Sequence, residues 1–376
     1  MQKKYPHEPH RFTADHLEEL LAYCTEQGAS DITIQTAEPI IIEVYGKLYK
    51  ITKRHLTNSE VIEFLNAIYG PNGNTQILSG QDVDTHFEFR PSRGSRFRYR
   101  VNGTGCQVEG HHGIQLTLRT IPTYPPDLET LGLPQAILEA IKPEDGVVYV
   151  TGATGSGKST LLASIIKDIA QDPDSNRKIL TYEAPIEFVF DNVKRPTAVI
   201  SQSEIPLHLP SFADGVRNAL RRKPRLILVG ESRDTETISA VLEAALTGHP
   251  VYTTVHSNGV AETVRRLVGA FPPEELQGRT IDIIETLRLI IWQKLVPSVE
   301  GKRVALREYL VFDEDVRDQL LSVDPERVTA MTRQLVNTKG QPMIVDAQQK
   351  YEEGLIGERE YQLMAKMARS GELVHR

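Results

Sequence analysis

The sequence predicts an α/β fold, in which a parallel β-sheet covered by helices on both faces follows a smaller domain of mixed helices and strands. Beyond about residue 146, short and uniformly apolar runs alternate with helical patterns, as do strands that are buried on both faces. A glycine-rich segment at residues 152–160 separates one such run from an amphipathic helix. Residues 120–127 contain three prolines, which disfavour helix and strand pairing and indicate a linker.

The first 119 residues carry the signals of an α+β domain. Residues 12–28 and 61–69 have helical spacing of apolar residues, and each stretch ends at a glycine. Apolar and polar residues alternate, as in strands, at residues 30–48, 85–89, 97–101 and 114–118. We therefore predict an α+β domain at residues 1–119 and a proline-rich linker at residues 120–132.

The rest of the chain divides into a sheet domain and a helical tail. Apolar strands are expected at residues 146–150, 178–182, 225–229 and 250–255. The tail has helical spacing over residues 348–376. We place the sheet domain at residues 133–300 and a small, mainly helical C-terminal region at residues 301–376.

Composition limits the class of function. The chain has 376 residues and a formal net charge of -7, which argues against a general polyanion binder, so no direct nucleic-acid binding is expected. Cys24 and Cys106 lack the spacing of a disulfide framework or a zinc site. A reducing, cytoplasmic setting fits these two cysteines. No run of about eighteen apolar residues occurs, so we expect no transmembrane segment, and any contact with a membrane is peripheral.

The strongest motif is a phosphate-binding loop between a predicted strand and a predicted helix. It reads GxxxxGK[ST] and consists of Gly152, Ala153, Thr154, Gly155, Ser156, Gly157, Lys158, Ser159 and Thr160. The glycines let backbone N–H groups turn toward phosphates, and the helix adds its positive N-terminal end. We expect the ammonium of Lys158 on the β- and γ-phosphates of ATP and the hydroxyl of Ser159 on Mg²⁺. The alternative is a glycine-rich turn that matches by chance.

Three carboxylates follow predicted strands at the edge where ligands bind in open α/β sheets. Glu231 follows the apolar run at residues 225–229 and is our candidate for the general base or water-orienting residue. Glu183 and Glu187 flank a proline and are expected to hold water or the outer shell of the metal. Ser159, Glu231 and Glu187 together form the predicted magnesium site. For each carboxylate, the alternative is a solvated surface charge. Asp234 reads equally well as a helix N-cap.

Two histidines flank the predicted strand at residues 250–255. His256 follows it, where the other motifs converge, and is interpreted as a sensor of the γ-phosphate, with a core histidine as the alternative. His249 precedes the strand, and both readings stay open for it.

Arginines alternate within the strand-like segment near residue 97. Arg96, Arg98 and Arg100 would share one face, either as a solvated edge strand or, with Arg119, as arginine fingers that reach the phosphates of an adjacent subunit.

The order of these motifs resembles the secretion ATPase superfamily of PilT-like, type II and type IV secretion ATPases, and most of all the DotB-like ATPases of type IVB systems. The resembling segments are the phosphate loop, the acidic box at residues 183–187, the Val-Gly-Glu-x-Arg-Asp strand end and the Thr-Gly-His…Thr-x-His pair. The resemblance implies a homohexamer with PAS-like N-terminal and RecA-like C-terminal domains at the cytoplasmic side of the inner membrane, working with membrane components of a secretion complex. It also implies that Arg96, Arg98 and Arg119 act from the N-terminal domain.

The sequence departs from the family pattern in three places. Ala184 stands where the acidic box usually has an aspartate, and Arg222 and Lys223 replace an acidic pair. The C-terminal retraction signature is not evident at residues 316–318. Besides an ATPase that powers secretion, the alternatives are a pilus retraction motor, a nucleotide-gated assembly factor with little turnover, and a nucleic-acid motor. The sequence does not identify the cargo, the membrane partner or the direction of work.

Overall fold

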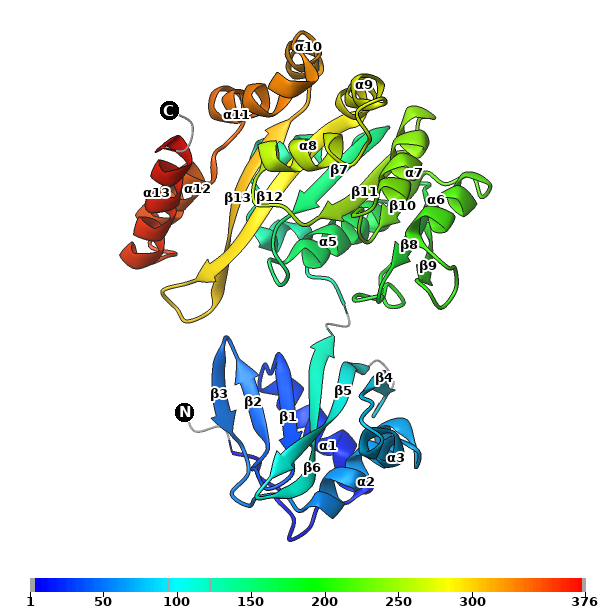
Figure 1. Cartoon of the computed structure of the whole chain (residues 1–376), viewed down its shortest axis with the longest axis vertical. Helices are drawn as coiled ribbons and strands as arrows, with labels where there is room; N and C mark the ends of the chain where they lie inside the picture. Colours follow the sequence, from blue (N-terminus) through cyan, green and yellow to red (C-terminus); the bar gives the residue numbers. More distant parts are fainter. Residues whose placement is uncertain (1–3, 93–94, 122–123, 374–376) are drawn as a thin grey trace. The chain divides into compact units, whose positions relative to one another are not determined.

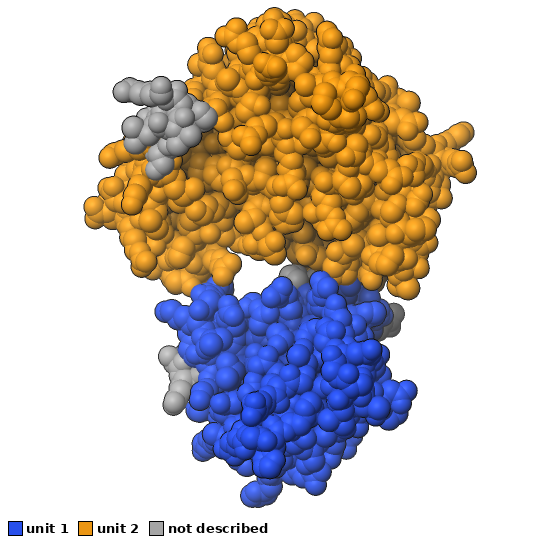
Figure 2. Space-filling model, in the orientation of Figure 1, with its two compact units in different colours: residues 1–123 blue, residues 124–376 orange. Residues whose placement is uncertain are grey.

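The computed structural model describes residues 4–92, 95–121 and 124–373, which divide into two compact units, residues 1–123 and 124–376 (Figures 1 and 2). Thr120 and Ile121, which we assigned to the linker, are instead the last residues of strand β6 (His111–Ile121). They pair with strand β5 (Phe97–Val108), so the sheet extends two residues into the predicted linker. Residues 122 and 123 of the predicted linker lie outside the described residues.

Unit 1 is an antiparallel sheet packed with helices. Its strand order is β3-β2-β1-β6-β5-β4, where the remaining strands are β1 (Asp31–Gln35), β2 (Ile41–Val44), β3 (Lys47–Lys50) and β4 (Val83–Phe89). The helices are η1 (Ala14–His16), α1 (Leu17–Glu26), α2 (Asn58–Tyr69) and α3 (Gly73–Leu78). One apolar core joins the sheet to α1 and α2 and includes Cys24, which is fully buried.

The stretch at residues 30–48 is not one strand, because the chain reverses within it. Tyr45 and Gly46 both have positive φ, at 51° and 78°, as the central residues of a tight hairpin turn do. Strand β3 therefore pairs antiparallel with β2 across the turn.

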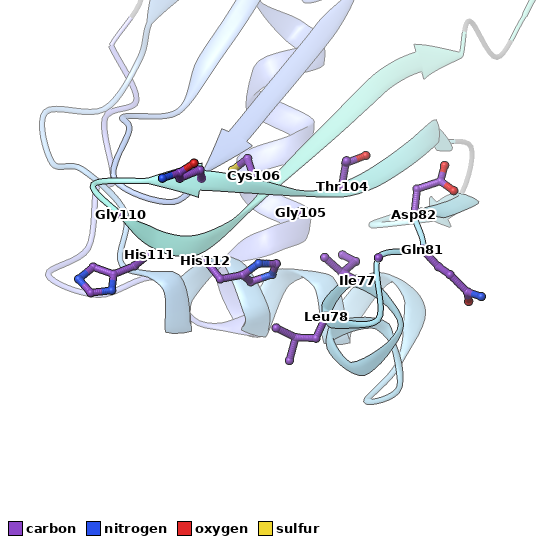
Figure 3. A pocket seen from close by; sticks show the side chains of 12 residues that line it. Ile77, Leu78, Gln81, Asp82, Thr104, Gly105, Cys106, Gly110, His111 and His112 are labelled. Atoms are coloured by element: carbon purple, nitrogen blue, oxygen red, sulfur yellow. The ribbon is translucent and has the colours of Figure 1, made fainter.

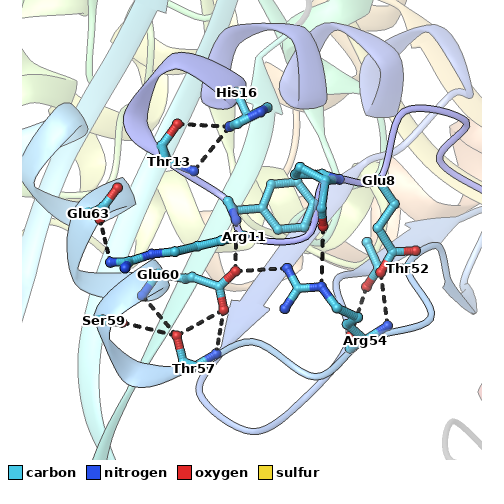
Figure 4. Close-up of polar contacts among 12 residues, drawn as sticks. Glu8, Arg11, Thr13, His16, Thr52, Arg54, Thr57, Ser59, Glu60 and Glu63 are labelled. Atoms are coloured by element: carbon cyan, nitrogen blue, oxygen red, sulfur yellow. Dashed lines mark hydrogen bonds and ion pairs between the residues drawn. The ribbon is translucent and has the colours of Figure 1, made fainter.

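A buried carboxylate fixes the start of helix α2 (Figure 4). Glu60 is 1% exposed and accepts hydrogen bonds from the backbone N–H groups of Phe12 and Thr57 and from the guanidinium of Arg54, at 2.7, 2.8 and 2.8 Å. Burial raises the pKa of Glu60, but these hydrogen bonds outweigh it and lower the pKa to about 2. Glu60 thus ties the N-terminal segment to α2 as an ionised group.

Unit 2 contains a seven-stranded sheet in the order β13-β12-β7-β11-β10-β8-β9. The strands are β7 (Gly146–Thr151), β8 (Lys178–Glu183), β9 (Val199–Glu204), β10 (Leu226–Val229), β11 (Pro250–Val255), β12 (Leu287–Pro297) and β13 (Arg303–Val311). Neighbouring strands are parallel except β13, which pairs antiparallel with β12. The boundary that we placed at residue 300 was wrong, because it divides the β12–β13 hairpin of one sheet.

Helices cover both faces of this sheet (Figure 1). One core holds Val148 and Val150 of β7 against α4 (Gln135–Ala140) and α5 (Lys158–Gln171). The other core holds Val147 and Tyr149 and includes residues of α6 (Phe212–Leu220), α7 (Thr235–Leu246), α8 (Val260–Val268) and α9 (Leu276–Thr286), and of the helices at residues 314–321 and 328–338. Alternate residues of β7 therefore serve opposite layers, which explains the uniformly apolar run.

The chain ends in helices α10 (Glu314–Leu321), α11 (Val328–Thr338), α12 (Met343–Glu352) and α13 (Glu358–Leu373). Short 3-10 helices precede α4, at η2 (Leu128–Leu131), and α11, at η3 (Pro325–Arg327). A satellite core packs α12 and α13 onto the β12–β13 hairpin. Within the described residues, no helix combines the length and apolar character needed to cross a bilayer.

Candidate active site

The phosphate loop connects the end of β7 to the first turn of α5. Gly152, Gly155 and Gly157 all have positive φ, at 145°, 75° and 83°, a backbone conformation that side chains disfavour. Gly152 also leaves no room for a side chain, since an added Cβ would lie 2.4 Å from the backbone oxygen of Gln293. The loop thus has the conformation and the close packing expected of a phosphate cradle, and Ser159 and Thr160 lie half-buried in the first turn of the helix.

Lys158 lies at the centre of this loop. Its side chain is mostly buried, and its ammonium donates to the backbone oxygens of Gly152 and Ala153 at 3.0 and 2.8 Å. Burial lowers the pKa of Lys158, while the charges of Glu187 and Glu231 oppose that shift. The ammonium is therefore held within the loop and under the electrostatic influence of two of the predicted carboxylates.

Glu231 and His256 meet at the carboxyl ends of β10 and β11. The Nε2 of His256 lies 3.7 Å from the Oε1 of Glu231, and both side chains are partly exposed. The strand ends are joined by a 2.6 Å hydrogen bond from the hydroxyl of Thr254 to the carbonyl of Gly230. Because β11 pairs in parallel with β7, His256 follows the strand end beside Thr151, where the phosphate loop begins.

The acidic box begins at Glu183, the last residue of β8, at the same edge of the sheet. One carboxylate oxygen of Glu183 accepts hydrogen bonds from the hydroxyl of Thr181 and the amide of Gln202, at 2.7 and 3.1 Å. The peptide bond between Ala184 and Pro185 is cis. The charge of Glu187 acts on Lys158, so the box lies in electrostatic range of the loop.

Asp234 and His249, for which the sequence left a functional and a structural interpretation open, both make local structural hydrogen bonds. Asp234 is the N-cap of α7, and its carboxylate accepts from the N–H of Thr237 at 2.8 Å. His249 precedes β11, whose first residue is paired with Gly146, at the edge opposite the phosphate loop. Its Nδ1 lies 3.0 Å from the carbonyl oxygen of Ala244. His249 and His256 therefore lie at opposite ends of one strand.

The predicted finger arginines belong to unit 1, and each is paired with a carboxylate there. Glu88 lies 2.8 Å from Arg96 and 3.7 Å from Arg98, and Asp31 lies 3.0 Å from Arg119. Strand β5 lies between β4 and β6, so the solvated edge-strand interpretation is wrong. The side chains of Arg96 and Arg98 are only 17% and 12% exposed, whereas that of Arg119 is 67% exposed.

Two buried polar residues next to the phosphate loop were not predicted from the sequence. Gln293 of β12 donates to the backbone oxygen of Ser156 at 2.7 Å and accepts from the guanidinium of Arg307 of β13 at 2.9 Å. The signal that could have found Gln293 is a glutamine within the apolar run Leu-Ile-Ile-Trp-Gln-Lys-Leu-Val.

A pocket of about 360 Å³ adjoins the loop within unit 2. It is lined by Gly157 and Thr160, by the apolar side chains of Leu131, Leu161 and Leu295, and by the cationic residues Arg303, Arg307 and Lys350. Its apolar wall, with the exposed Arg303 beside it, suits a nucleoside joined to phosphates.

A larger hollow of about 690 Å³ lies on unit 1 (Figure 3). Its wall includes Cys106, His111 and His112 from β5 and β6. Burial raises the pKa of the Cys106 thiol, and this side chain is only half-buried. Among the described residues that line this hollow, none belongs to the predicted site.

Comparison with known proteins connects this geometry to a family. The family described as Type II/IV secretion system protein matches residues 10–308. The X-ray structure of the Legionella pneumophila ATPase DotB is 64% identical in sequence, with a TM-score of 0.93 over 97% of this chain and 99% of that one. The crystal structure of the pilus retraction motor PilT with bound ADP is 32% identical, with a TM-score of 0.77 over 92% of this chain and 96% of that one. The type IV pilus retraction ATPase PilT of Pseudomonas aeruginosa is 35% identical over 303 residues, 80% of this chain and 83% of that protein.

Proposed function

Since the chain belongs to the type II/IV secretion system protein family, we propose that it is a hexameric ATPase that powers a type IVB secretion system at the inner membrane. It is a secretion ATPase with a RecA-like sheet domain, similar to DotB and PilT. The observation that carries the proposed chemistry is the ammonium of Lys158, which lies within a glycine-rich loop and in electrostatic range of Glu187 and Glu231. A phosphate group fits this cradle because it needs both the cation and the backbone N–H groups.

We assign the hydrolytic step to Glu231. Its carboxylate follows β10 at the ligand-binding edge, 3.7 Å from Nε2 of His256, and can accept a hydrogen bond from water and hold it for in-line attack on the terminal phosphate. We assign to His256 the response to the loss of that phosphate. Glu183 is held by Thr181 and is assigned to the outer shell of the site.

We assign magnesium to Ser159, Glu187 and Glu231. A hydroxyl and carboxylates are the kind of oxygen ligands that this ion prefers, so these three side chains would hold it. When bound, it supplies positive charge that neutralises the phosphates and orients them. Ser159 lies in the first turn of α5, directly after Lys158.

We place the adenosine in the pocket of about 360 Å³ beside Gly157 and Thr160. This assignment is tested by Leu295→Trp, which adds a large ring to the wall. The variant should raise the KM for ATP and leave competitive inhibition by tripolyphosphate unchanged. Equal KM values for ATP in variant and wild type would contradict the assignment of the nucleoside to this pocket.

Phosphate release from the purified protein tests the division of roles. Lys158→Ala should abolish ATP binding, whereas Glu231→Gln should preserve binding and remove hydrolysis. Glu243→Gln, an exposed acid on α7, is the matched control and should retain wild-type turnover. Wild-type turnover no greater than that of Glu231→Gln would favour a nucleotide-gated assembly factor over a motor.

Particle images of the full chain with and without a non-hydrolysable ATP analogue test the ring. Six-fold particles support the hexamer, and monomers under both conditions contradict it. Stimulation of turnover by DNA or RNA would instead favour a nucleic-acid motor, which the net charge of -7 disfavours. A pilus retraction motor remains the alternative cellular role, given the similarity to PilT.

A further inference from the structure

A buried hydrogen-bonded chain joins the phosphate loop to the β12–β13 hairpin and to α12. Gln293 and Arg307, its two central residues, are 3% and 2% exposed. We propose that Gln293 and Arg307 are positioning residues for ATP, which hold the backbone of the loop in its phosphate-binding conformation. This inference rests on the proposed function, because it concerns the same nucleotide site.

The direction of the chain is fixed by hydrogen-bond chemistry. A guanidinium has donors and no acceptor, so the amide oxygen of Gln293 must face the Nε of Arg307, 2.9 Å away. The amide nitrogen then faces the carbonyl oxygen of Ser156, 2.7 Å away. Arg307 thereby sets the orientation of Gln293 without touching the loop itself.

The hydrogen bond that fixes the carbonyl of Ser156 also fixes the direction of the next N–H in the loop, that of Gly157. In a planar trans peptide, the carbonyl of one residue and the N–H of the next point to opposite sides. The N–H of Gly157 is therefore directed away from Gln293. An N–H in this part of the motif is a phosphate donor, so the hydrogen bond from Gln293 acts on the cradle through one peptide plane.

The loop and Gln293 are fitted closely to each other. A Cβ added at Gly157 would lie 2.8 Å from the amide nitrogen of Gln293. A Cβ at Gly152 would lie 2.4 Å from the backbone oxygen of the same glutamine. Both glycines therefore permit an approach that a larger residue would prevent, and this contact is made from the side of β12.

Arg307 is anchored by groups from two further segments. Its guanidinium donates to the backbone oxygens of Gly132 and Leu131, at 3.2 and 2.9 Å. The backbone N–H of Arg307 donates to the carboxylate of Asp346 in α12 at 2.7 Å. Asp346 also accepts from Lys350 at 2.7 Å. Burial lowers the pKa of Arg307 to about 10, opposed by Asp346, so the guanidinium stays charged at neutral pH. Its position is therefore determined by several acceptors at once.

The decisive variant is Gln293→Glu, which keeps the length of the side chain and the acceptor for Arg307 but removes the donor to Ser156. With magnesium and a fluorescent ADP analogue, we expect the Kd from anisotropy to rise about tenfold, the usual effect of one lost hydrogen bond. The thermal midpoint should change little, because the stronger pairing of a carboxylate with Arg307 offsets the lost hydrogen bond to Ser156. A purely structural role for Gln293 predicts a lowered thermal midpoint and an unchanged Kd.

A double-mutant cycle tests whether Arg307 acts through Gln293. Arg307→Lys keeps a positive charge but loses the planar fork, so it should weaken nucleotide binding, and combining it with Gln293→Glu should add less than the sum of the two effects. Thr332→Val is the control, since it removes a buried hydroxyl that donates to Val328 in α11, and it should leave the Kd unchanged. Additive effects would overturn the relay.

The outcomes separate this inference from the proposed function. Failure of the wild type to bind the ADP analogue contradicts the proposed nucleotide site. Wild-type binding together with an unchanged Kd for Gln293→Glu leaves the proposed function intact and overturns the positioning role.

Discussion

Substitution of Glu60 gives a quantitative test of the N-terminal unit. Its pKa is lowered from 4.5 to about 2, because hydrogen bonds from Arg54, Thr57 and Phe12 outweigh the effect of burial. Each pH unit corresponds to about 1.4 kcal/mol, so ionised Glu60 contributes about 3 kcal/mol to the stability of the folded state at neutral pH. Glu60→Gln should lower the free energy of unfolding of unit 1 by about that amount at pH 7.

The pH dependence has a defined sign. A carboxylate with a lowered pKa in the folded state contributes fully above its unfolded pKa, here 4.5, and the contribution is lost as the pH falls toward about 2. The difference between wild type and Glu60→Gln should therefore be constant above about pH 5 and shrink progressively below it.

Chemical denaturation of the full chain measures this effect. The only tryptophan, Trp292, belongs to unit 2, so its fluorescence follows that unit while far-UV circular dichroism follows both. Glu60→Gln should shift part of the dichroism transition and leave the fluorescence transition unchanged. Glu63→Gln, on the same helix, breaks a surface pair with Arg11 and should cost less than about 1 kcal/mol. Equal effects of the two substitutions would refute the argument.

Three further predictions concern nucleotide binding and turnover. Gly157→Ala adds a methyl group 2.8 Å from the amide of Gln293 at a positive φ, so ATP affinity should fall at least tenfold in a binding titration. Glu231→Gln subunits mixed with Arg98→Ala subunits should regain some phosphate release if arginines cross between subunits, and no rescue at any ratio would argue against fingers. Glu88→Gln removes a carboxylate that competes for Arg98, so turnover at subsaturating ATP should rise; an unchanged rate would mean that this pairing does not limit activity.

The sequence predicted the sheet of unit 2 where local patterns were sufficient. Strands β7, β8, β10 and β11 each contain a run of buried, mostly apolar residues because helices cover both faces, and such runs are recognisable in isolation. The β12–β13 hairpin was divided by a false boundary, because its partner strand β7 lies far away in the sequence. Pairing between distant strands is a tertiary property that local periodicity does not contain.

The candidate site was predictable to the extent that strand direction determined it. Parallel strands bring the residues that follow them to one edge, and the structure brings Glu231 and His256 together there. The same reasoning could not decide between cap and site for Asp234, because an N-cap and a ligand use the same carboxylate. Gln293 was missed because its partner Ser156 is 137 positions earlier in the chain.

The distribution of two rare residue types makes the chain convenient for spectroscopy. Cys24 is fully buried, and burial raises the pKa of its thiol to about 12, whereas Cys106 is half-buried in the hollow of unit 1. A maleimide dye applied to the native protein should thus react at Cys106 alone. With Trp292 as the donor in unit 2, energy transfer to that dye would follow the separation of the two units during ATP turnover without any engineered residue.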